Sequence, residues 1–140
     1  MSTLFTKIIE GEIPGRFVWR DDDVVAFLTI NPITSGHTLV VPVLEVDHWL
    51  DLPTGIAQRC ITVSQVIGRA QMAAFSPTRI GVIIAGLEVP HTHLHLIPID
   101  SEADLSFAKA DPSPDPAHLD AAAARLRDAL RDLGHSEVSS

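Results

Sequence analysis

The 140-residue sequence has one cysteine, Cys60, no cluster of basic residues, and no apolar run close to 20 residues long. A single cysteine excludes an internal disulfide and a cysteine-rich zinc site. The 10 Lys and Arg residues are scattered and outnumbered by 18 Asp and Glu, so a surface that follows nucleic-acid phosphates is not expected. Because there is also no charged leader followed by an apolar segment, we predict a soluble cytoplasmic protein that binds neither nucleic acid nor a membrane.

The sequence is rich in apolar residues, which make up 46% of the chain. That proportion supports one folded domain spanning residues 1–140. Between residues 53 and 75, Cys60 belongs to a series of apolar residues spaced by three and four, which predicts a long helix with one buried face. The other members of the series are Ile56, Val63, Ile67, Ala70 and Ala74.

The remaining elements follow from turn and capping signals. A short helix is expected to start after Ser2 or Thr3 and to stop before Pro14. Strands are predicted at residues 17–20, 24–28, 37–43, 79–85 and 91–98, and the acidic triplet 21–23 is interpreted as a turn rather than a metal site. Residues 99–114 should cross the surface, a helix should occupy about 115–133, and the last residues should fray. Strands with one inserted helix and one appended helix indicate an α+β fold with an antiparallel sheet.

Residues 91–98, HTHLHLIP, place three histidines at alternate positions. Successive side chains of a strand point to opposite faces, so a strand here would put His91, His93 and His95 on one face. Leu94 and Leu96 would then face the core. We predict a core-facing side and a histidine side within the same short segment.

Three explanations of the histidine side remain open. It could be a polar, solvent-facing edge strand. It could bind a metal, although His91 and His95 would lie about 13 Å apart at Cα and could not share one ion. In that case two neighbours such as His91 and His93 would need a third ligand, for example His37. It could also be catalytic, because imidazole is a competent nucleophile toward phosphorus and is neutral near physiological pH. The central ring, His93, would then be the natural nucleophile.

The segment HTHLHLI resembles the motif His-φ-His-φ-His-φ-φ, with φ apolar, of the histidine-triad superfamily of nucleotide hydrolases and transferases. Thr92 is a mild departure from that motif. FTKIIEGEIP, VVAFLTINPITSGHTLVVP and IIAGLEVP also resemble stretches of this family, so the likeness covers about residues 3–98. The extension 99–140 resembles the extra helix of some bacterial members. The resemblance implies a five-stranded antiparallel sheet with a long central helix, a short N-terminal helix and a C-terminal helix.

The resemblance also implies roles for individual residues. His93 would form a nucleotidyl-histidine intermediate, with His91 and His95 flanking the phosphate and His37 supporting them from the neighbouring strand. A purine base would lie between apolar side chains, and polar groups would hold the ribose and the phosphate or leaving group; these nucleotide-binding positions are Leu4, Phe5, Ile8, Phe27, Thr29, Ile30, Asn31 and Glu88. Phe27 and Ile30 could equally be core residues, Glu88 a surface turn residue, and His37 a residue that begins a strand. No cofactor or metal is implied, and a homodimer with the long helix at its interface is expected.

Several positions depart from the family pattern. Thr29 stands where an acidic residue often meets the ribose hydroxyls, and a threonine cannot accept from both hydroxyls as a carboxylate does. Leu87 stands where glutamine is common, and the strand RIGVIIAG lacks a usual asparagine. Thr3 and Thr6 replace a cysteine pair that binds zinc in some members. These departures predict weaker or altered recognition of the nucleoside, with the chemistry at phosphorus retained. The triad and the resemblance together predict a nucleotide hydrolase or phosphoramidase acting at an α-phosphate, or a dinucleoside polyphosphate hydrolase. The alternatives are a nucleotide-binding regulatory module without turnover and a metal-binding protein.

Overall fold

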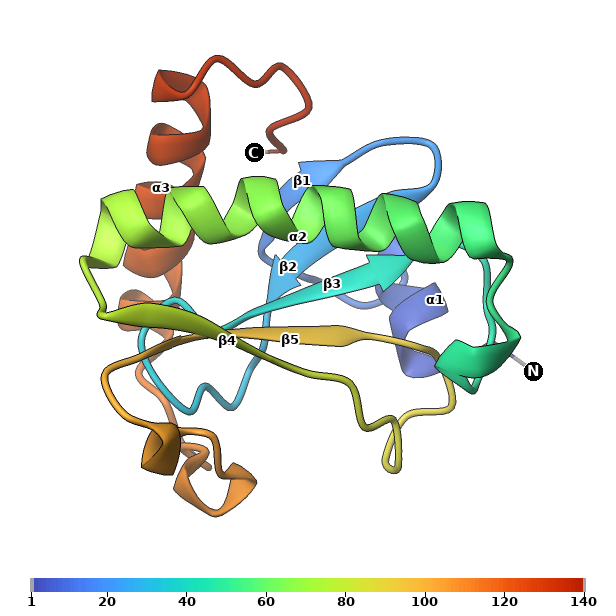
Figure 1. Ribbon diagram of the computed structural model, residues 1–140, viewed down its shortest axis with the longest axis horizontal. Helices are drawn as coiled ribbons and strands as arrows, with labels where there is room; N and C mark the ends of the chain where they lie inside the picture. The colour runs from blue at the N-terminus through green and yellow to red at the C-terminus, as the bar shows by residue number, and fades with distance from the viewer. Residues whose placement is uncertain (1, 140) are drawn as a thin grey trace.

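Five antiparallel strands form one sheet in the order β1-β2-β3-β5-β4 (Figure 1). The computed structural model describes residues 2–139. The strands are β1 Phe17–Arg20, β2 Val24–Leu28, β3 Thr38–Pro42, β4 Arg79–Ile83 and β5 Leu94–Ile99. Three α-helices accompany them, α1 Leu4–Ile9, α2 Thr54–Phe75 and α3 Pro116–Asp132, together with three short 3-10 helices, η1 Trp49–Asp51, η2 Glu102–Asp104 and η3 Phe107–Lys109. The predicted α+β class and antiparallel sheet are confirmed.

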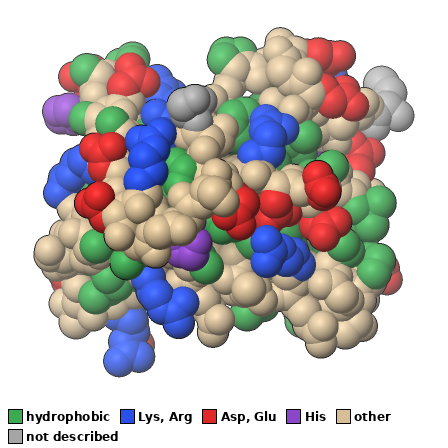
Figure 2. All heavy atoms as spheres, turned by 90° about the horizontal axis from the view of Figure 1, so that it is seen from above, with side chains coloured by type: hydrophobic (Ala, Val, Ile, Leu, Met, Phe, Trp, Pro, Cys, Tyr) green, Lys and Arg blue, Asp and Glu red, His purple; other side chains and the backbone are tan. Residues whose placement is uncertain are grey.

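The helix boundaries follow the local signals in the sequence. The Thr3 side chain accepts a hydrogen bond from the Thr6 amide and caps α1, and the Asp115 side chain caps α3 through the Ala117 amide. At the C-terminal end of α2, Ser76 adopts the left-handed conformation that closes many helices, with a φ of 51°. None of the described helices is long and apolar enough to cross a membrane. On the face drawn in Figure 2, acidic and basic side chains are interspersed.

The two faces of the sheet bury different sets of side chains. α2 and α3 cover one face, and Figure 1 shows α2 running along β4 and β5. The core on this face is mainly aliphatic and includes Val24, Val40, Ile67, Leu94, Leu96, Leu126 and Leu130. α1 covers part of the opposite face, where a smaller cluster contains Phe5, Ile8, Val25, Phe27, Leu39 and Val41. The opposite face is therefore only partly covered by helix.

The two edge strands, β1 and β4, differ in the backbone hydrogen bonds of their outer sides. Along β1, the Arg20 amide donates to the Glu137 carbonyl at 3.0 Å, the Ser139 amide donates to the Val18 carbonyl at 3.2 Å, and Val138 bridges to Trp19. The prediction that the last residues fray is therefore wrong for residues 137–139, because the free backbone groups of β1 give them hydrogen-bond partners. Among the described strands, β4 is paired on one side only.

Two other sequence predictions need correction. The predicted strand 91–98 begins only at Leu94, because the amides of His91 and Thr92 bond instead to the carbonyls of Val89 and Val46, at 2.8 and 2.7 Å. Residues 99–114 do not simply cross the surface. They contain η2 and η3 and are tied to the loop after β2 by a hydrogen bond from the Asp111 amide to the Pro32 carbonyl at 2.9 Å.

Candidate active site

The histidines gather on the face of the sheet that α1 covers. Backbone pairing aligns Phe27 of β2, Leu39 of β3, His95 of β5 and Ile83 of β4 in one row across the sheet. Phe27 and Leu39 belong to the α1-side cluster, so His95 lies on the same face, while Leu94 and Leu96 enter the core under α2. The predicted division of this segment into a core side and a histidine side is confirmed for the part that forms β5.

His37 and His95 form a directed pair. The Ile33 amide donates to His37 Nδ1 at 3.0 Å, so the ring proton of neutral His37 is on Nε2. His37 Nε2 lies 2.9 Å from His95 Nδ1 and donates to it, which leaves the proton of His95 on Nε2. Burial is the main cause that lowers the pKa of His37 to about 3 and that of His95 to about 4, and a neighbouring histidine adds to each effect. Both rings are neutral at neutral pH, and His95 Nε2 is left as a hydrogen-bond donor.

His93 has the opposite tautomer. Its Nδ1 lies 2.7 Å from the His91 carbonyl oxygen, which can only accept, so Nδ1 carries the proton and Nε2 keeps a lone pair. The side chain is 6% exposed, and burial lowers its pKa although the bond to His91 opposes this. The Phe5 ring packs edge-on against it with centroids 4.8 Å apart. The arrangement can therefore present a neutral nitrogen nucleophile in a fixed orientation.

His91 is enclosed and has both ring nitrogens bonded. Its Nε2 donates to the Pro42 carbonyl at 2.7 Å, and its Nδ1 lies 2.8 Å from the Thr3 hydroxyl. Glu45 accepts from the Thr3 amide at 2.8 Å and from the Thr6 hydroxyl at 2.7 Å. Because Nε2 carries the ring proton, Nδ1 of neutral His91 can only accept, and the Thr3 hydroxyl is the donor. His91 therefore links the start of α1 to the loop before β5. Unlike His93, it has no ring nitrogen left to act as a nucleophile.

The predicted nucleoside-binding residues are divided between core and surface. Phe5, Ile8 and Phe27 are buried in the α1-side cluster, whereas Leu4 is 44% and Ile30 66% exposed. The two exposed side chains offer open apolar area, whereas the three buried ones belong to the core.

Two of the three polar positions predicted to bind the nucleotide, Thr29 and Asn31, have partners within the chain. The Thr29 hydroxyl accepts from the Asn31 amide at 3.2 Å, and the Asn31 side chain donates to the Asp111 carbonyl at 3.0 Å. Glu88 is exposed in the loop between β4 and β5, and its charge acts to raise the pKa of His93, against the larger effect of burial. Leu87 beside it is 96% exposed.

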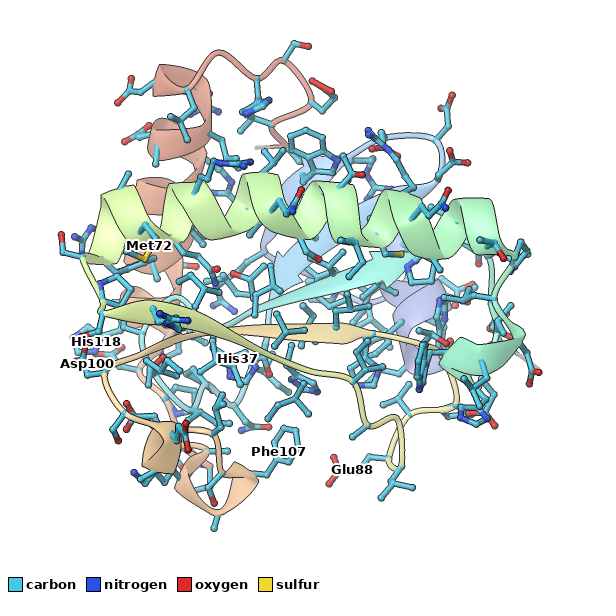
Figure 3. The ribbon with its side chains drawn as sticks, viewed as in Figure 1. His37, Met72, Glu88, Asp100, Phe107 and His118 are labelled. Atoms are coloured by element: carbon cyan, nitrogen blue, oxygen red, sulfur yellow. The ribbon has the colours of Figure 1, made fainter. Side chains whose placement is uncertain are left out.

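The sequence prediction missed Phe107. This ring of η3 lies edge-on to His95, with centroids 4.9 Å apart. In Figure 3, Phe107 from η3 and Glu88 from the β4–β5 loop both lie on the side of β5 away from α2. The available signal was one aromatic residue within the polar stretch 99–114, and nothing in its spacing points toward a histidine 12 residues earlier.

A metal site does not fit the donor atoms present. In residues 2–139, no three His, Cys, Asp or Glu side chains are grouped so that they could hold a metal ion. His91 Nδ1 faces threonine hydroxyls, which are poor zinc ligands compared with thiolates or imidazoles. His37 and His95 are hydrogen-bonded to one another. No step of the chemistry is therefore assigned to a metal.

Comparisons with known proteins identify relatives of this chain. The family model "HIT domain" matches residues 10–102. An uncharacterized HIT-like protein of Borreliella burgdorferi is 40% identical over 102 residues, which is 68% of this chain and 73% of that protein. The purine nucleoside phosphoramidase of Escherichia coli is 35% identical over 101 residues, covering 68% of this chain and 85% of that protein. A crystal structure of a zinc-bound histidine triad family protein from Mycobacterium smegmatis superposes with a TM-score of 0.82 at 29% identity, covering 95% of this chain and 96% of that one.

Proposed function

Because the chain belongs to the HIT family of nucleotide-binding hydrolases, we propose that it hydrolyses a nucleotide at its α-phosphate through a covalent bond to His93. The observation that supports this proposal most strongly is that two adjacent rings, His93 and His95, carry their protons on different nitrogens. His93 Nε2 has a lone pair, His95 Nε2 has a proton, and the ring centroids are 4.9 Å apart. A nucleophile beside a hydrogen-bond donor is the pair that attack on a phosphate requires.

The reaction has two displacements at phosphorus. In the first, the His93 Nε2 lone pair forms an N–P bond while the bond from phosphorus to the leaving group breaks, and the leaving group takes that electron pair and a proton from solvent. In the second, a water oxygen bonds to phosphorus and releases a proton to solvent. The N–P electron pair then returns to Nε2, and the nucleoside monophosphate departs.

The other histidines have supporting roles in this proposal. His95 Nε2–H donates to a non-bridging phosphate oxygen, and the hydrogen bond from His37 keeps that proton on Nε2. The backbone carbonyl of His91 accepts a hydrogen bond from His93 Nδ1–H. This bond orients the nucleophile and keeps the lone pair on Nε2. We assign Leu4, Ile30 and the buried Phe5, Ile8 and Phe27 to the nucleoside side, with Thr29 near the ribose.

The E. coli relative, a purine nucleoside phosphoramidase, favours an amine as the leaving group and a purine as the base. The second candidate is a nucleotide-binding module without turnover. It is favoured by the hydrogen bonds that Thr29 and Asn31 make within the chain, which leave less hydrogen-bonding capacity for a ribose.

Incubation with adenosine and guanosine phosphoramidates and with dinucleoside polyphosphates tests the proposal. We expect release of nucleoside monophosphate, loss of that activity in His93→Ala, and a nucleotidyl adduct that maps to His93 by mass spectrometry. His118→Ala, which changes an exposed histidine on α3, is the control and should keep full activity. Equal activity of His93→Ala would contradict the mechanism, and tight binding without turnover would favour the binding module.

We also propose that the protein acts as a homodimer that joins through β4 and α2. The tail covers the β1 edge of the sheet, but β4 has a partner on one side only and exposes Val82 by 49%. On α2, Ile61 and Met72 are 49% and 40% exposed. An unpaired apolar edge strand favours pairing with a second chain. Sedimentation equilibrium should give a dimer that Val82→Lys weakens, and a monomeric wild-type protein would contradict the proposal.

A further inference from the structure

Gln71 is a fully buried amide on the face of α2 that packs against the sheet. Its Nε2 lies 3.0 Å from the Gly36 carbonyl oxygen and 3.0 Å from the Leu96 carbonyl oxygen. Because a carbonyl oxygen can only accept, the nitrogen end of the amide faces both of them and donates one hydrogen to each. A single side chain of α2 therefore joins the loop before β3 to β5.

The two bonded carbonyls flank the paired histidines in the sequence. Gly36 immediately precedes His37, and Leu96 immediately follows His95. The rings of His37 and His95 are hydrogen-bonded at 2.9 Å. The same two backbone segments are thus linked twice, by imidazoles on the open face of the sheet and by Gln71 from the face under α2. Since Gln71 bonds to backbone carbonyls, its effect on the imidazoles is transmitted through the backbone.

Strand pairing alone does not extend to His37. The pairing of β3 with β5 ends where Thr38 lies opposite Leu96, so His37 is one residue outside it. Beyond this pair, side chains tie the loop to β5. The Thr34 hydroxyl donates to the Pro98 carbonyl at 2.7 Å, and Gln71 joins Gly36 to Leu96. The separation of the two histidines therefore depends on side-chain contacts as well as on the sheet.

The loop backbone is shaped to approach α2 at this point. Gly36 has a φ of 88°, in the left-handed region that favours glycine. A Cβ on Gly36 would collide with the ring of Phe75, which lies one helical turn after Gln71 on α2. This close approach is independent of the hydrogen bond, and it brings the Gly36 carbonyl within reach of the Gln71 amide.

The other end of the amide shows that Gln71 does more than fill the core. Gln71 Oε1 is buried and has no hydrogen-bond partner among the described residues. A buried acceptor without a partner destabilises a folded protein. If the position only had to fill the core, an apolar side chain of similar size would avoid this cost. The two hydrogen bonds that the nitrogen makes are the feature that an apolar side chain could not supply.

We propose that Gln71 is a positioning residue that keeps His37 bonded to His95 and so keeps the His95 proton on Nε2. This inference rests on the proposed function, in which His95 Nε2–H donates to a phosphate oxygen. Without the Gln71 amide, the backbone at Gly36 and Leu96 is free to separate and the bond between the rings weakens. Neutral His95 then distributes its proton between both nitrogens, and the transition state loses part of a preorganised donor.

The kinetics of a variant that removes both donors test this role. Gln71→Met has a side chain of similar length and cannot donate. We expect its kcat on an adenosine phosphoramidate to fall about tenfold while KM stays within about twofold. Gln71→Asn keeps an amide with a shorter reach and should lose less. Gln58→Met makes the same change at an exposed glutamine of α2 and should alter neither value. Unchanged kcat in Gln71→Met, or a loss confined to KM, would overturn the proposal.

The ¹⁵N chemical shifts of the imidazoles give a readout that needs no turnover, because they distinguish the two neutral tautomers. His95 should carry its proton on Nε2 in the wild type and on both nitrogens in Gln71→Met or Gln71→Asn. His93, bonded to the His91 carbonyl, should keep Nδ1–H in all of them and is the internal control. An unchanged His95 tautomer in both folded variants would overturn the positioning role. A wild type that cleaves no phosphoramidate would remove the proposed function, whereas hydrolysis that does not depend on Gln71 would remove only this inference.

Discussion

The two faces of β5 perform different tasks with alternating residues of one strand. On the face under α2, Leu94 and Leu96 are 2% and 1% exposed and lie in an aliphatic core. On the other face, His95 has one ring nitrogen bonded to His37 and is flanked by His93 and Phe107. On the covered face the fit of side-chain volumes decides which residues are tolerated. On the open face the function depends on which ring nitrogen carries a proton. Substitutions on the two faces should therefore fail in different ways.

The largest expected effect on stability comes from the covered face. Leu96→Ala should lower the free energy of unfolding by about 2–5 kcal/mol, because it leaves a cavity in a closely packed core. Chemical denaturation measures this loss, and activity per folded molecule should remain near that of wild type. Leu133→Ala makes the same change at a side chain that is 48% exposed at the end of α3, and it should cost far less. Equal losses for the two variants would contradict the burial of Leu96 in a closely packed core.

The open face should make stability depend on pH. The unfolded chain protonates His37 and His95 near pH 6.5, but the folded chain keeps them neutral down to about pH 3 and 4. The unfolded state therefore binds more protons in this window, and stability falls as the pH drops from 6.5 toward 4. Each histidine contributes about 1.4 kcal/mol per pH unit at most. Denaturation at pH 7 and pH 5.5 measures the slope, which His95→Asn should reduce; an equal slope in that variant would assign the pH dependence to other groups.

The smallest of these effects should come from the link between α1 and the open face. Thr3→Val removes the hydroxyl that donates to His91 Nδ1 and caps α1. We expect kcat to fall about tenfold with little change in KM, because the support of the nucleophile is loosened while substrate contacts stay. Thr3→Ser restores the hydroxyl and should restore kcat. A loss in KM alone, or no rescue by serine, would contradict a positioning role for Thr3.

Periodic and capping patterns predicted much of this structure. The apolar series around Cys60 predicted α2, and Asp115 with Pro116 predicted the start of α3, because these signals act within one or two helical turns. The strands at 17–20 and 24–28 were placed at their observed boundaries, since Asp21 accepts from the Asp23 and Val24 amides and fixes the turn.

Long-range contacts explain the features that could not be predicted. His91 leaves the strand register because its backbone and ring bond to Val89, Pro42 and Thr3, and neither Pro42 nor Thr3 is near it in sequence. Residues 137–139 become ordered only because β1 offers a free edge. Phe107 reaches His95 from the segment 100–111, whose last residue is hydrogen-bonded to Asn31 and Pro32, about 80 residues earlier. None of these long-range contacts can be inferred from a local sequence pattern.

The central claim is that turnover passes through a bond between phosphorus and His93. Hydrolysis of a nucleoside phosphoramidate whose α-phosphorus is made chiral by isotopic labelling tests it most directly. Each in-line displacement inverts the configuration at phosphorus, so two displacements predict a nucleoside monophosphate with net retention. Net inversion would mean that water attacks the substrate directly, and it would contradict the account.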